Sequence, residues 1–341
     1  MDSLTQIVLG AACGEVALGK KIGNKALLFG AIGGTIPDLD VFTSRWIYSN
    51  EIDIMAAHRG FSHSIVFSIL GAFVFGWLVY WIYNRGKRKD VTTKKDWIWL
   101  FFLALSTHIL LDAFTPYGTQ WFLPFSRYRV AFNNISVVDL LYTLPFLLCL
   151  VVMMFFRRNT KRRNVWLKLG LGISSLYMLL TIINKFYVNY VFKTSLVKDT
   201  IPYIRFSTQP TILNNILWYG IAETETSYYV GFYSLLDKEQ KVDKWQELPK
   251  NHKLVSTENK DIKRLAWFSN GYYNFMPLEE ENTFRFNDLR YPLFNEEDPN
   301  SSVFSFTIYK KSDSWDALPF DGKIPDEEDF SQFINRIKGK K

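Results

Sequence analysis

Three of the chain's four histidines lie in two short motifs at the edges of apolar segments. The motifs are His58-Arg-Gly-Phe-Ser-His63 and His108-Ile-Leu-Leu-Asp112, and Pro37-Asp38-Leu-Asp40 adds two carboxylates upstream. Ionisable side chains at membrane depth cost about 2.5–3.5 kcal/mol each even on the lenient insertion scale, so a cluster of them needs a compensating partner. A divalent metal ion is a partner that imidazoles and carboxylates share. The sequence therefore predicts a metal site in a membrane protein.

The pair His108 and Asp112 has the spacing of one helical face. Residues at i and i+4 of a helix lie about 5–6 Å apart at Cβ, so both side chains can bind one ion or two adjacent ions. The alternative is a simple His–Asp hydrogen bond that ties helices together, which the same spacing allows.

His58 and His63 are five residues apart, which is a poor match to one helical face. Gly60 between them indicates a turn, with a serine capping the span that follows. Such a loop can aim both imidazoles at one point. The alternative is an interfacial loop whose polar residues contact only water and lipid headgroups.

The acidic motif follows an apolar stretch. Pro37 disfavours helix at Ile36, so the chain is expected to be bent or extended here. In extended chain, residues i and i+2 point the same way, so Asp38 and Asp40 can face one ion. Paired aspartates after a helix are also ordinary turn residues.

Charge is unevenly distributed along the 341 residues. Residues 1–192 carry 20 Lys and Arg against 10 Asp and Glu, a net charge of +10, whereas residues 193–341 carry 20 against 23, a net charge of −3. The positive charge lies in short loops between apolar runs, where it sets membrane orientation rather than nucleic-acid binding. Cys13 and Cys149 lie in apolar segments and indicate neither a disulfide framework nor a thiolate zinc site.

Four apolar stretches have about the length that a membrane helix needs, roughly 20 residues. They are Ser64–Tyr83, Trp97–Phe114, Val137–Phe156 and Val165–Ile183. Two earlier stretches, Leu4–Leu18 and Ala26–Ile36, are shorter and rich in Gly and Ala, which suits close helix packing. The sequence leaves open whether these two span the membrane or re-enter it.

The loops between these stretches predict their orientation. Residues 85–96 carry six Lys and Arg and residues 157–163 carry five, so both loops are expected in the cytoplasm. The alternation of the spans then puts both histidine motifs on the outer face, together with Asp139 at the start of the third span. If Ala26–Ile36 runs outward from the lysines that precede it, Asp38 and Asp40 emerge on the same face. Everything after Asn184 is expected outside as well.

From about residue 193 the composition changes to short aromatic and β-branched runs broken by Asn, Gly and Pro, which is typical of strands. The predicted strands are Pro202–Ser207, Ile216–Ala222, Ser227–Leu235, Arg264–Phe268, Phe284–Phe286 and Ser302–Tyr309. Asn270-Gly271 predicts a turn between two of them, and Asp326–Ile337 predicts a short amphipathic helix. We therefore expect an α-helical multi-pass membrane domain over residues 1–192 and a mainly β soluble domain over residues 193–341.

The hypothesis of a metal site depends on the motifs acting together. Ten acids precede Lys193, and the predicted outer face combines four of them with three histidines: Asp38, Asp40, Asp112, Asp139, His58, His63 and His108. These ligands suffice for one or two ions. Nitrogen and oxygen ligands without thiolate fit Zn²⁺, Mn²⁺ or Fe²⁺ better than Ca²⁺. Two such ions can clamp the oxygens of a hydrolytic displacement.

Three further residues can take part in the chemistry. Arg59 can bind a phosphate or carboxylate through its planar guanidinium. Glu15 lies inside an apolar stretch and can serve as a base, as an extra ligand, or only in helix packing. Asp139 can be a ligand or can accept the hydrogen bond that orients a histidine.

Several segments carry a resemblance to a known family. The opening Met1-Asp-Ser-Leu-Thr-Gln-Ile-Val-Leu-Gly, the Pro37 motif, His58-Arg59-Gly60-Phe61-Ser62-His63-Ser64, His108-Ile-Leu-Leu-Asp112-Ala-Phe-Thr-Pro-Tyr-Gly, Asp139 and Asn287-Asp-Leu-Arg290 resemble bacterial inner-membrane metal-dependent hydrolases of the YdjM type. The resemblance covers most of the chain and implies a hydrolase class. A fainter similarity to zinc phospholipase C and P1 nuclease-like enzymes points to phosphoesters. Many members have His where this chain has Gln6, which implies one ligand fewer here if that His binds metal.

The leading hypothesis is a membrane-bound metal-dependent hydrolase of the bacterial inner membrane. Its predicted metal ligands are Asp38, Asp40, His58, His63, His108 and Asp112, with Glu15, Arg59 and Asp139 in catalysis. The expected substrate is a phosphoester or lipid-like molecule at the outer membrane face, and no nucleic acid is expected as partner. The alternative is a non-enzymatic transporter, or a scaffold that presents the β domain. A transport relay predicts polar residues spaced through the membrane thickness, whereas here they gather at one edge.

Overall fold

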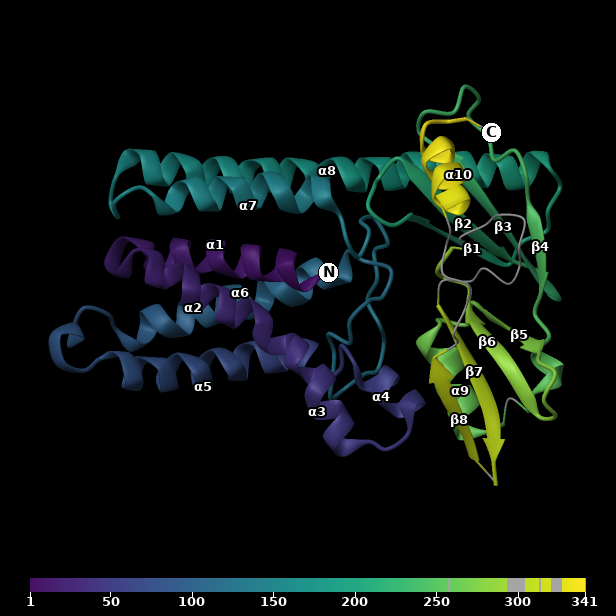
Figure 1. The fold of residues 1–341 in the computed structure, drawn as a ribbon, viewed down its shortest axis with the longest axis horizontal. Helices are drawn as coiled ribbons and strands as arrows, with labels where there is room; N and C mark the ends of the chain where they lie inside the picture. The colour runs from purple at the N-terminus through teal and green to yellow at the C-terminus, as the bar shows by residue number, and fades with distance from the viewer. Residues whose placement is uncertain (257, 293–303, 313, 320–326, 341) are drawn as a thin grey trace. The chain divides into compact units, whose positions relative to one another are not determined.

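The computed structural model describes residues 1–256, 258–292, 304–312, 314–319 and 327–340. The chain forms two compact units, residues 1–43 with 57–182 and residues 44–56 with 183–341. The first unit is helical and the second is built mainly of strands (Figure 1). The predicted fold class is therefore confirmed. The second unit begins before the predicted boundary at residue 193 and also includes residues 44–56.

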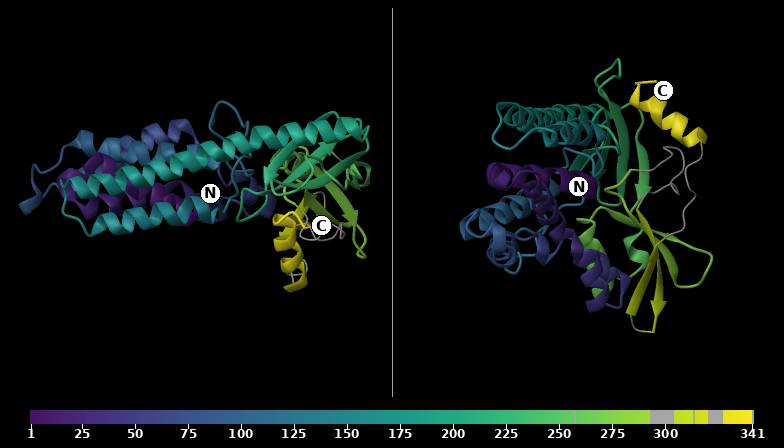
Figure 2. Two further views of the ribbon diagram at one scale, coloured as in Figure 1. Left: turned by 90° about the horizontal axis from the view of Figure 1, so that it is seen from above. Right: turned by 60° about the vertical axis from the view of Figure 1, so that its left-hand side comes forward.

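Helices that run alongside one another make up the first unit (Figures 1 and 2). They are α1 (Ser3–Ile22), α2 (Asn24–Thr35), α5 (Ile65–Tyr83), α6 (Lys94–Ala113), α7 (Leu140–Met154) and the part of α8 (Lys161–Lys198) up to residue 182. Shorter helical segments join them: η1 (Ile36–Leu39), the start of α3 (Asp40–Ile47), η2 (Phe61–His63) and η3 (Gly86–Arg88).

Four helical stretches of the described residues are long and apolar enough to cross a membrane, namely Asn24–Ile47, Ile65–Tyr83, Lys94–Ala113 and Lys161–Lys198. The first joins α2, η1 and α3, so the stretch predicted only as Ala26–Ile36 is long enough to span. The predicted span Val137–Phe156 is instead the 15-residue helix α7, because Asp139 caps its start and the helix ends at Met154.

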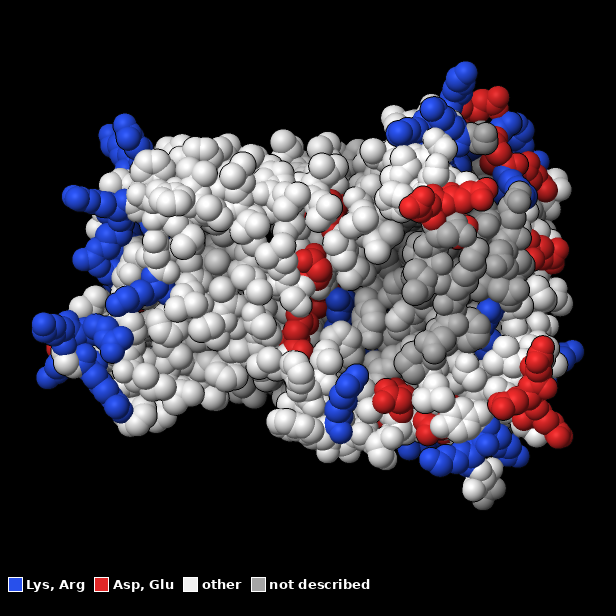
Figure 3. Space-filling view, viewed as in Figure 1, with Lys and Arg blue, Asp and Glu red and all other residues white. Residues whose placement is uncertain are grey.

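The surface of the first unit agrees with a membrane environment. On the face that Figure 3 shows, Lys and Arg gather at one end of this unit and its flank carries almost no charge. The loops with the highest density of positive charge are residues 85–96 and 157–163. An uncharged flank between charged ends is what a membrane-spanning unit requires.

Glycines set the packing of α1 against α2. A Cβ at Gly14 would lie 2.0 Å from the carbonyl oxygen of Ala26, and one at Gly30 would lie 2.2 Å from that of Gly10. Residues without a side chain let two helix backbones approach this closely. The close packing expected from the Gly and Ala content is confirmed. It matters for function because α2 leads directly into η1.

Two four-stranded antiparallel sheets form most of the second unit, and in each sheet strands that follow one another in sequence are neighbours. The first contains β1 (Arg205–Pro210), β2 (Leu217–Glu223), β3 (Ser227–Ser234) and β4 (Gln246–Pro249), and the second contains β5 (Tyr273–Pro277), β6 (Thr283–Asp288), β7 (Ser305–Lys311) and β8 (Ser314–Pro319). Tyr219 pairs with Phe232 in one sheet and Phe275 with Phe286 in the other. These aromatic pairs lie in the two sheet cores.

Helical segments complete the second unit: α4 (Glu51–Ala57), η4 (His252–Leu254), α9 (Lys260–Phe268) and α10 (Glu327–Ile337). Ile52 of α4 is fully buried in the core of the second sheet, among residues that include Phe275. Asp53 forms an ion pair with Arg264 of α9. These contacts explain why residues 44–56 belong to the second unit.

The strand predicted over Arg264–Phe268 is wrong, because these residues form the end of α9. Asn259 caps the start of this helix, and Ile262, Leu265 and Phe268 recur every three residues to bury one helical face. The five-residue window was too short to show that period. Five predicted strands do overlap β1, β2, β3, β6 and β7.

The predicted turn and several strands of the second unit also differ from the structure, and a few predicted residues lie outside the described ranges. Asn270 and Gly271 form a turn with positive φ angles of 52° and 74°, but the turn follows α9 rather than a strand. β4, β5 and β8 were not predicted. Residues 302 and 303 of the last predicted strand, and residue 326 of the predicted helix, lie outside the described residues.

We predict that Gly14→Ala destabilises the protein, because the added methyl group meets the backbone oxygen of Ala26. Overpacking of this kind costs about 1–3 kcal/mol. Thermal unfolding in detergent, followed through the helical circular dichroism signal, measures the effect. Gly172→Ala in α8 is the matched control, since a Cβ there meets nothing within 4 Å. Equal melting temperatures for the two variants would contradict the close packing.

Candidate metal centre

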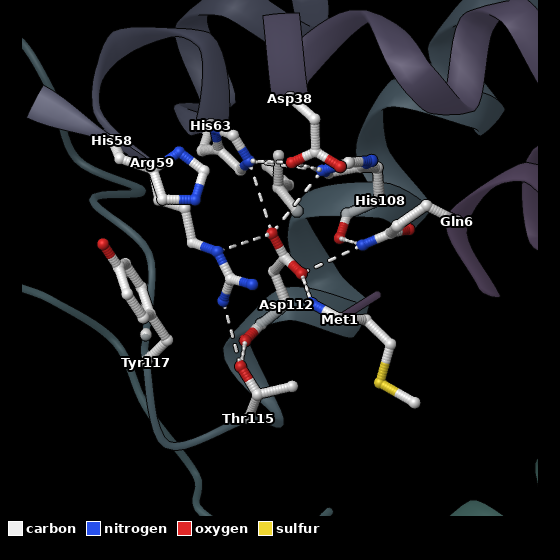
Figure 4. Close-up of polar contacts among 12 residues, drawn as sticks. Met1, Gln6, Asp38, His58, Arg59, His63, His108, Asp112, Thr115 and Tyr117 are labelled. Carbon is white, nitrogen blue, oxygen red and sulfur yellow. Dashed lines mark hydrogen bonds and ion pairs between the residues drawn. The ribbon is translucent and has the colours of Figure 1, made fainter. Parts of the chain in front are cut away.

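Four side chains of the first unit converge on one point (Figure 4). They belong to Asp38, His63, His108 and Asp112, and one ligand atom of each lies within 4.8 Å of the others. Asp38 comes from η1, His63 from η2, and the other two from the last turns of α6. Three segments that are distant in sequence therefore supply two imidazoles and two carboxylates.

The turn around Asp38 differs from its prediction. Residues 36–39 form a 3₁₀ helix, in which Pro37 takes one of the first positions because its missing N–H is not needed there. Asp38 and Asp40 consequently do not face the same way as they would in extended chain. Asp38 points to the two histidines His63 and His108, and Asp40 points to a neighbouring group of residues.

The ligand atoms are evenly spaced. Nε2 of His63 lies 3.2 Å from Nε2 of His108, 3.3 Å from Oδ1 of Asp38 and 3.3 Å from Oδ2 of Asp112. Nε2 of His108 lies 3.5 Å from each of the same two oxygens. Five of the six separations among the four atoms thus fall between 3.2 and 3.5 Å.

This spacing is that of ligands around one ion. Zinc–nitrogen and zinc–oxygen bonds of about 2.0–2.2 Å place neighbouring tetrahedral ligands about 3.3–3.6 Å apart. Oδ2 of Asp112 is buried and accepts no hydrogen bond from the described residues. The guanidinium of Arg59 is the cation beside it, with Nε 3.3 Å away, and the oxygen also lies 3.3 Å from Nε2 of His63 and 3.5 Å from Nε2 of His108. The donor set therefore fits one divalent ion with two nitrogen and two oxygen ligands.

Both histidines are held in the orientation that a metal needs. Nδ1 of His108 lies 2.7 Å from the carbonyl oxygen of Gly34, and Nδ1 of His63 lies 3.2 Å from Oδ2 of Asp40 and 3.0 Å from Oγ of Ser62. Metal-binding histidines commonly donate the other ring N–H to a carbonyl or carboxylate, which fixes the tautomer and leaves Nε2 for the ion.

Asp40 and His58 lie beside the four converging ligands and contact each other. Oδ1 of Asp40 is 2.8 Å from Nδ1 of His58, and Oδ2 accepts hydrogen bonds from the backbone N–H of Arg59 and from Ser62. Both residues were predicted as metal ligands. The structure instead gives Asp40 the position of a group that orients His63 and the loop from His58 to His63.

Arg59 is buried in the same region with its φ at 56°. Its Nε lies 3.3 Å from Oδ2 of Asp112, its Nη1 donates to Oγ1 of Thr115, and its guanidinium lies 4.6 Å from the ring centre of Tyr117. The guanidinium expected to bind a substrate anion thus already balances the charge of Asp112. A non-glycine residue at this φ is held there only by its surroundings.

Two groups at the site were not expected from the motifs. Nε2 of Gln6 donates to Oδ1 of Asp112 and to the carbonyl oxygen of His108, and the amino group of Met1 pairs with the same Oδ1. One indication of Gln6 came from the sequence, because many members of the family were expected to have His at this position. The structure places Gln6 at the centre, although its amide acts here as a donor to a ligand.

Glu15 and Asp139 lie in other interactions. Glu15 forms a buried bidentate ion pair with Arg163, with N–O distances of 2.7 and 2.6 Å. Asp139 caps α7 through the N–H groups of Leu141 and Tyr142, and its second oxygen accepts from Tyr177. Neither carboxylate joins the four converging ligands, and these contacts explain both as parts of the helix packing.

The electrostatics of the centre call for positive charge. Burial lowers the pKa of His63, but its contacts with Asp112, Asp38 and Asp40 outweigh burial and raise the pKa to about 10. With three carboxylates around it, the imidazole therefore holds a proton. An ion at the centre provides the same compensation while leaving the ring neutral.

Comparison with known proteins gives relatives for part of the chain. An uncharacterized protein, YfhP of Bacillus subtilis (strain 168), is 30% identical over 146 residues, which are 41% of this chain and 42% of YfhP. The inner membrane protein YbcI of Escherichia coli (strain K12) is 36% identical over 123 residues, 34% of this chain and 64% of YbcI. The chain thus matches less than two thirds of the length of either relative. No solved structure matches it.

The family to which the helical unit belongs is shown directly. The YdjM inner membrane protein family matches residues 1–188, more than half of the chain. This range includes all four converging side chains. The four described helical stretches that are long and apolar enough to span a membrane also begin within it. The chain belongs to the YdjM inner membrane protein family.

Proposed function

We propose that this protein is a membrane-bound metal-dependent hydrolase that cleaves a phosphoester or lipid-like substrate. The observation that supports the proposal most strongly is the spacing of 3.2–3.5 Å among Nε2 of His63, Nε2 of His108 and the oxygens of Asp38 and Asp112. Structural zinc sites are rich in cysteine, whereas mixed histidine and carboxylate ligands are typical of hydrolytic centres.

The number of ligands bears on which ion serves catalysis. Four protein ligands complete the tetrahedron of Zn²⁺, whereas an ion that takes five or six ligands, such as Mn²⁺ or Fe²⁺, keeps positions for substrate and water. Zn²⁺ can also expand to five ligands in a transition state. We therefore propose one ion at this centre and favour Mn²⁺ or Fe²⁺ if the centre is catalytic.

The residues around the ligands support an anionic substrate. A divalent ion held here supplies Lewis acidity toward an oxygen of the substrate. The charge of Arg59 offsets that of one of the three carboxylates Asp38, Asp40 and Asp112, so a loaded centre is close to neutral and does not repel a phosphate. Asp38 is the most exposed of the four ligands and marks the side from which substrate reaches the centre.

We further propose that the centre and the second unit lie outside the cytoplasm. The two loops with the most Lys and Arg, residues 85–96 and 157–163, support this orientation by the positive-inside rule. In this orientation the chain crosses from residues 85–96 through α6 and returns to residues 157–163 through the shorter apolar helix α7, so η1, η2 and the end of α6 lie at the opposite side.

A second candidate function is a structural ion without catalysis. It is favoured by the complete set of four ligands, because closed sites hold segments together and catalytic zinc sites keep an open position. In this case the ion joins η1, η2 and α6 in a membrane protein with a non-enzymatic role, such as a transporter or a scaffold for the sheets.

We predict that His63→Ala and His108→Ala lose stoichiometric metal, since each removes one of four ligands. Asp40→Asn should retain metal with an affinity lowered about 10–100-fold, the usual effect of losing a group that orients a ligand. Isothermal titration of chelator-treated protein with Zn²⁺ and Mn²⁺ measures both effects. His252→Ala, in the second unit, controls for loss of a histidine. Full affinity in His63→Ala would contradict the centre.

We predict that chelation abolishes hydrolysis and that one divalent ion per chain restores it. Bis(p-nitrophenyl) phosphate and phospholipid vesicles are suitable substrates for purified protein in detergent or nanodiscs. His108→Ala should stay inactive after reloading. Stoichiometric binding with higher melting temperature but no turnover of any ester or phosphoester would instead establish the structural ion.

We predict that a cysteine at Thr226, in the second unit, reacts with a membrane-impermeant maleimide added to intact cells, and that one at Asn159 does not. Both positions are exposed, and the native cysteines Cys13 and Cys149 are buried. Lysed cells, in which both positions should react, provide the control. The opposite pattern of labelling would invert the proposed orientation.

A further inference from the structure

Exposed apolar side chains lie directly beside the buried ligands of the metal centre. Leu39 separates Asp38 from Asp40, and Phe61 lies two residues before His63; both are about half exposed. Phe42, two residues beyond Asp40, is more exposed still. Soluble proteins rarely place large apolar side chains in water around a polar site.

A loop from the same end of the first unit extends this apolar surface. Phe122, Phe125 and Tyr128 are exposed, with Phe125 reaching 86%. Together with Leu39, Phe42 and Phe61 they form a set that we call the apolar collar. All six residues belong to the first unit.

The base of this loop is fixed to the motif that carries His63. The N–H groups of Thr119 and Val130 each donate to the other residue's carbonyl oxygen, which closes the loop. Gln120 donates to the carbonyl oxygen of Arg59, and Ile65 donates to that of Trp121. The aromatic tip is therefore presented from a rigid base that also holds the centre.

The position of the loop in the chain indicates what covers the collar. The loop joins the end of α6 at Ala113 to the start of α7 at Leu140, so its base lies where apolar helices meet the membrane surface. Trp and Tyr are typical of the level of lipid headgroups, and this loop supplies Trp121 and Tyr128. The loop thus follows directly from apolar helices and has the residue types of that depth.

We propose that the apolar collar lies in the outer lipid interface and delivers an acyl-chain-bearing substrate from the bilayer to the metal centre. The docking of the collar in lipid is argued only from the exposure of its six residues and from the position of the loop between α6 and α7. The delivery part rests on the proposed hydrolase function. The collar holds the acyl portion of the lipid in the membrane while its phosphate head reaches Asp38, the most exposed ligand.

Spin labels test the docking without any reference to activity. Single cysteines replace Phe125 and, as a water-exposed control, Glu239, in a variant with Cys13→Ala and Cys149→Ala. In nanodiscs of phosphatidylcholine and phosphatidylglycerol, the label at 125 should collide with oxygen more often than with a water-soluble nickel complex, and the label at 239 should show the reverse. Equal nickel accessibility at both positions overturns docking, and a dipolar signal between copies would indicate a second chain as the occupant instead.

Activity tests the delivery. Phe125→Ser should lower the hydrolysis of phosphatidylglycerol vesicles about tenfold or more, the effect of losing one buried phenyl group, without changing the rate on bis(p-nitrophenyl) phosphate. Phe155→Ser is the matched control, since Phe155 is equally exposed, at 84%, but lies at the other end of α7. Equal losses in the two variants overturn delivery. If the unmodified protein hydrolyses neither substrate, the hydrolase proposal fails, delivery fails with it, and the spin-label result decides docking.

Discussion

The buried carboxylate of Asp112 is the constraint on which the arrangement of the helical unit depends. It lies at the end of an apolar helix with no exposed surface, where an uncompensated charge is not tolerated. Arg59, His63, His108 and Gln6 all contact it. Four elements therefore meet around one group, and their contacts keep the loop between α4 and α5 against the end of α6.

Close backbone packing brings the remaining groups within reach. The carbonyl oxygen of Gly34, in α2, accepts the hydrogen bond from His108, and a Cβ at Gly34 would lie 2.5 Å from the backbone oxygen of Gln6. A larger residue at position 34 would separate α1 from α2 and move both the carbonyl group and Gln6. The small residues of the first two helices therefore serve the centre as well as the packing.

Asp40 and His58 connect the centre to the rest of the chain. They contact each other at 2.8 Å, and the segment between them includes residues 44–56, which pack within the second unit. The chain thus leaves the centre at Asp40, contributes Ile52 to the core of a β-sheet, and returns at His58. The chain thus enters the β unit after Thr43 and re-enters the helical unit at Ala57, immediately before the motif that holds His63.

The sequence by itself determined the fold class, most of the apolar helices and the three motifs, because ionisable residues at the ends of apolar stretches stand out against the cost of burying charge. It did not separate Asp38 from Asp40, since a 3₁₀ turn rather than extended chain decides that Asp38 alone points to Nε2 of both His63 and His108. It also did not assign Glu15, whose partner Arg163 lies 148 residues away. Side-chain direction and distant contacts exist only in the folded chain, so tertiary structure alone brought four of the nine candidate site residues together at one point.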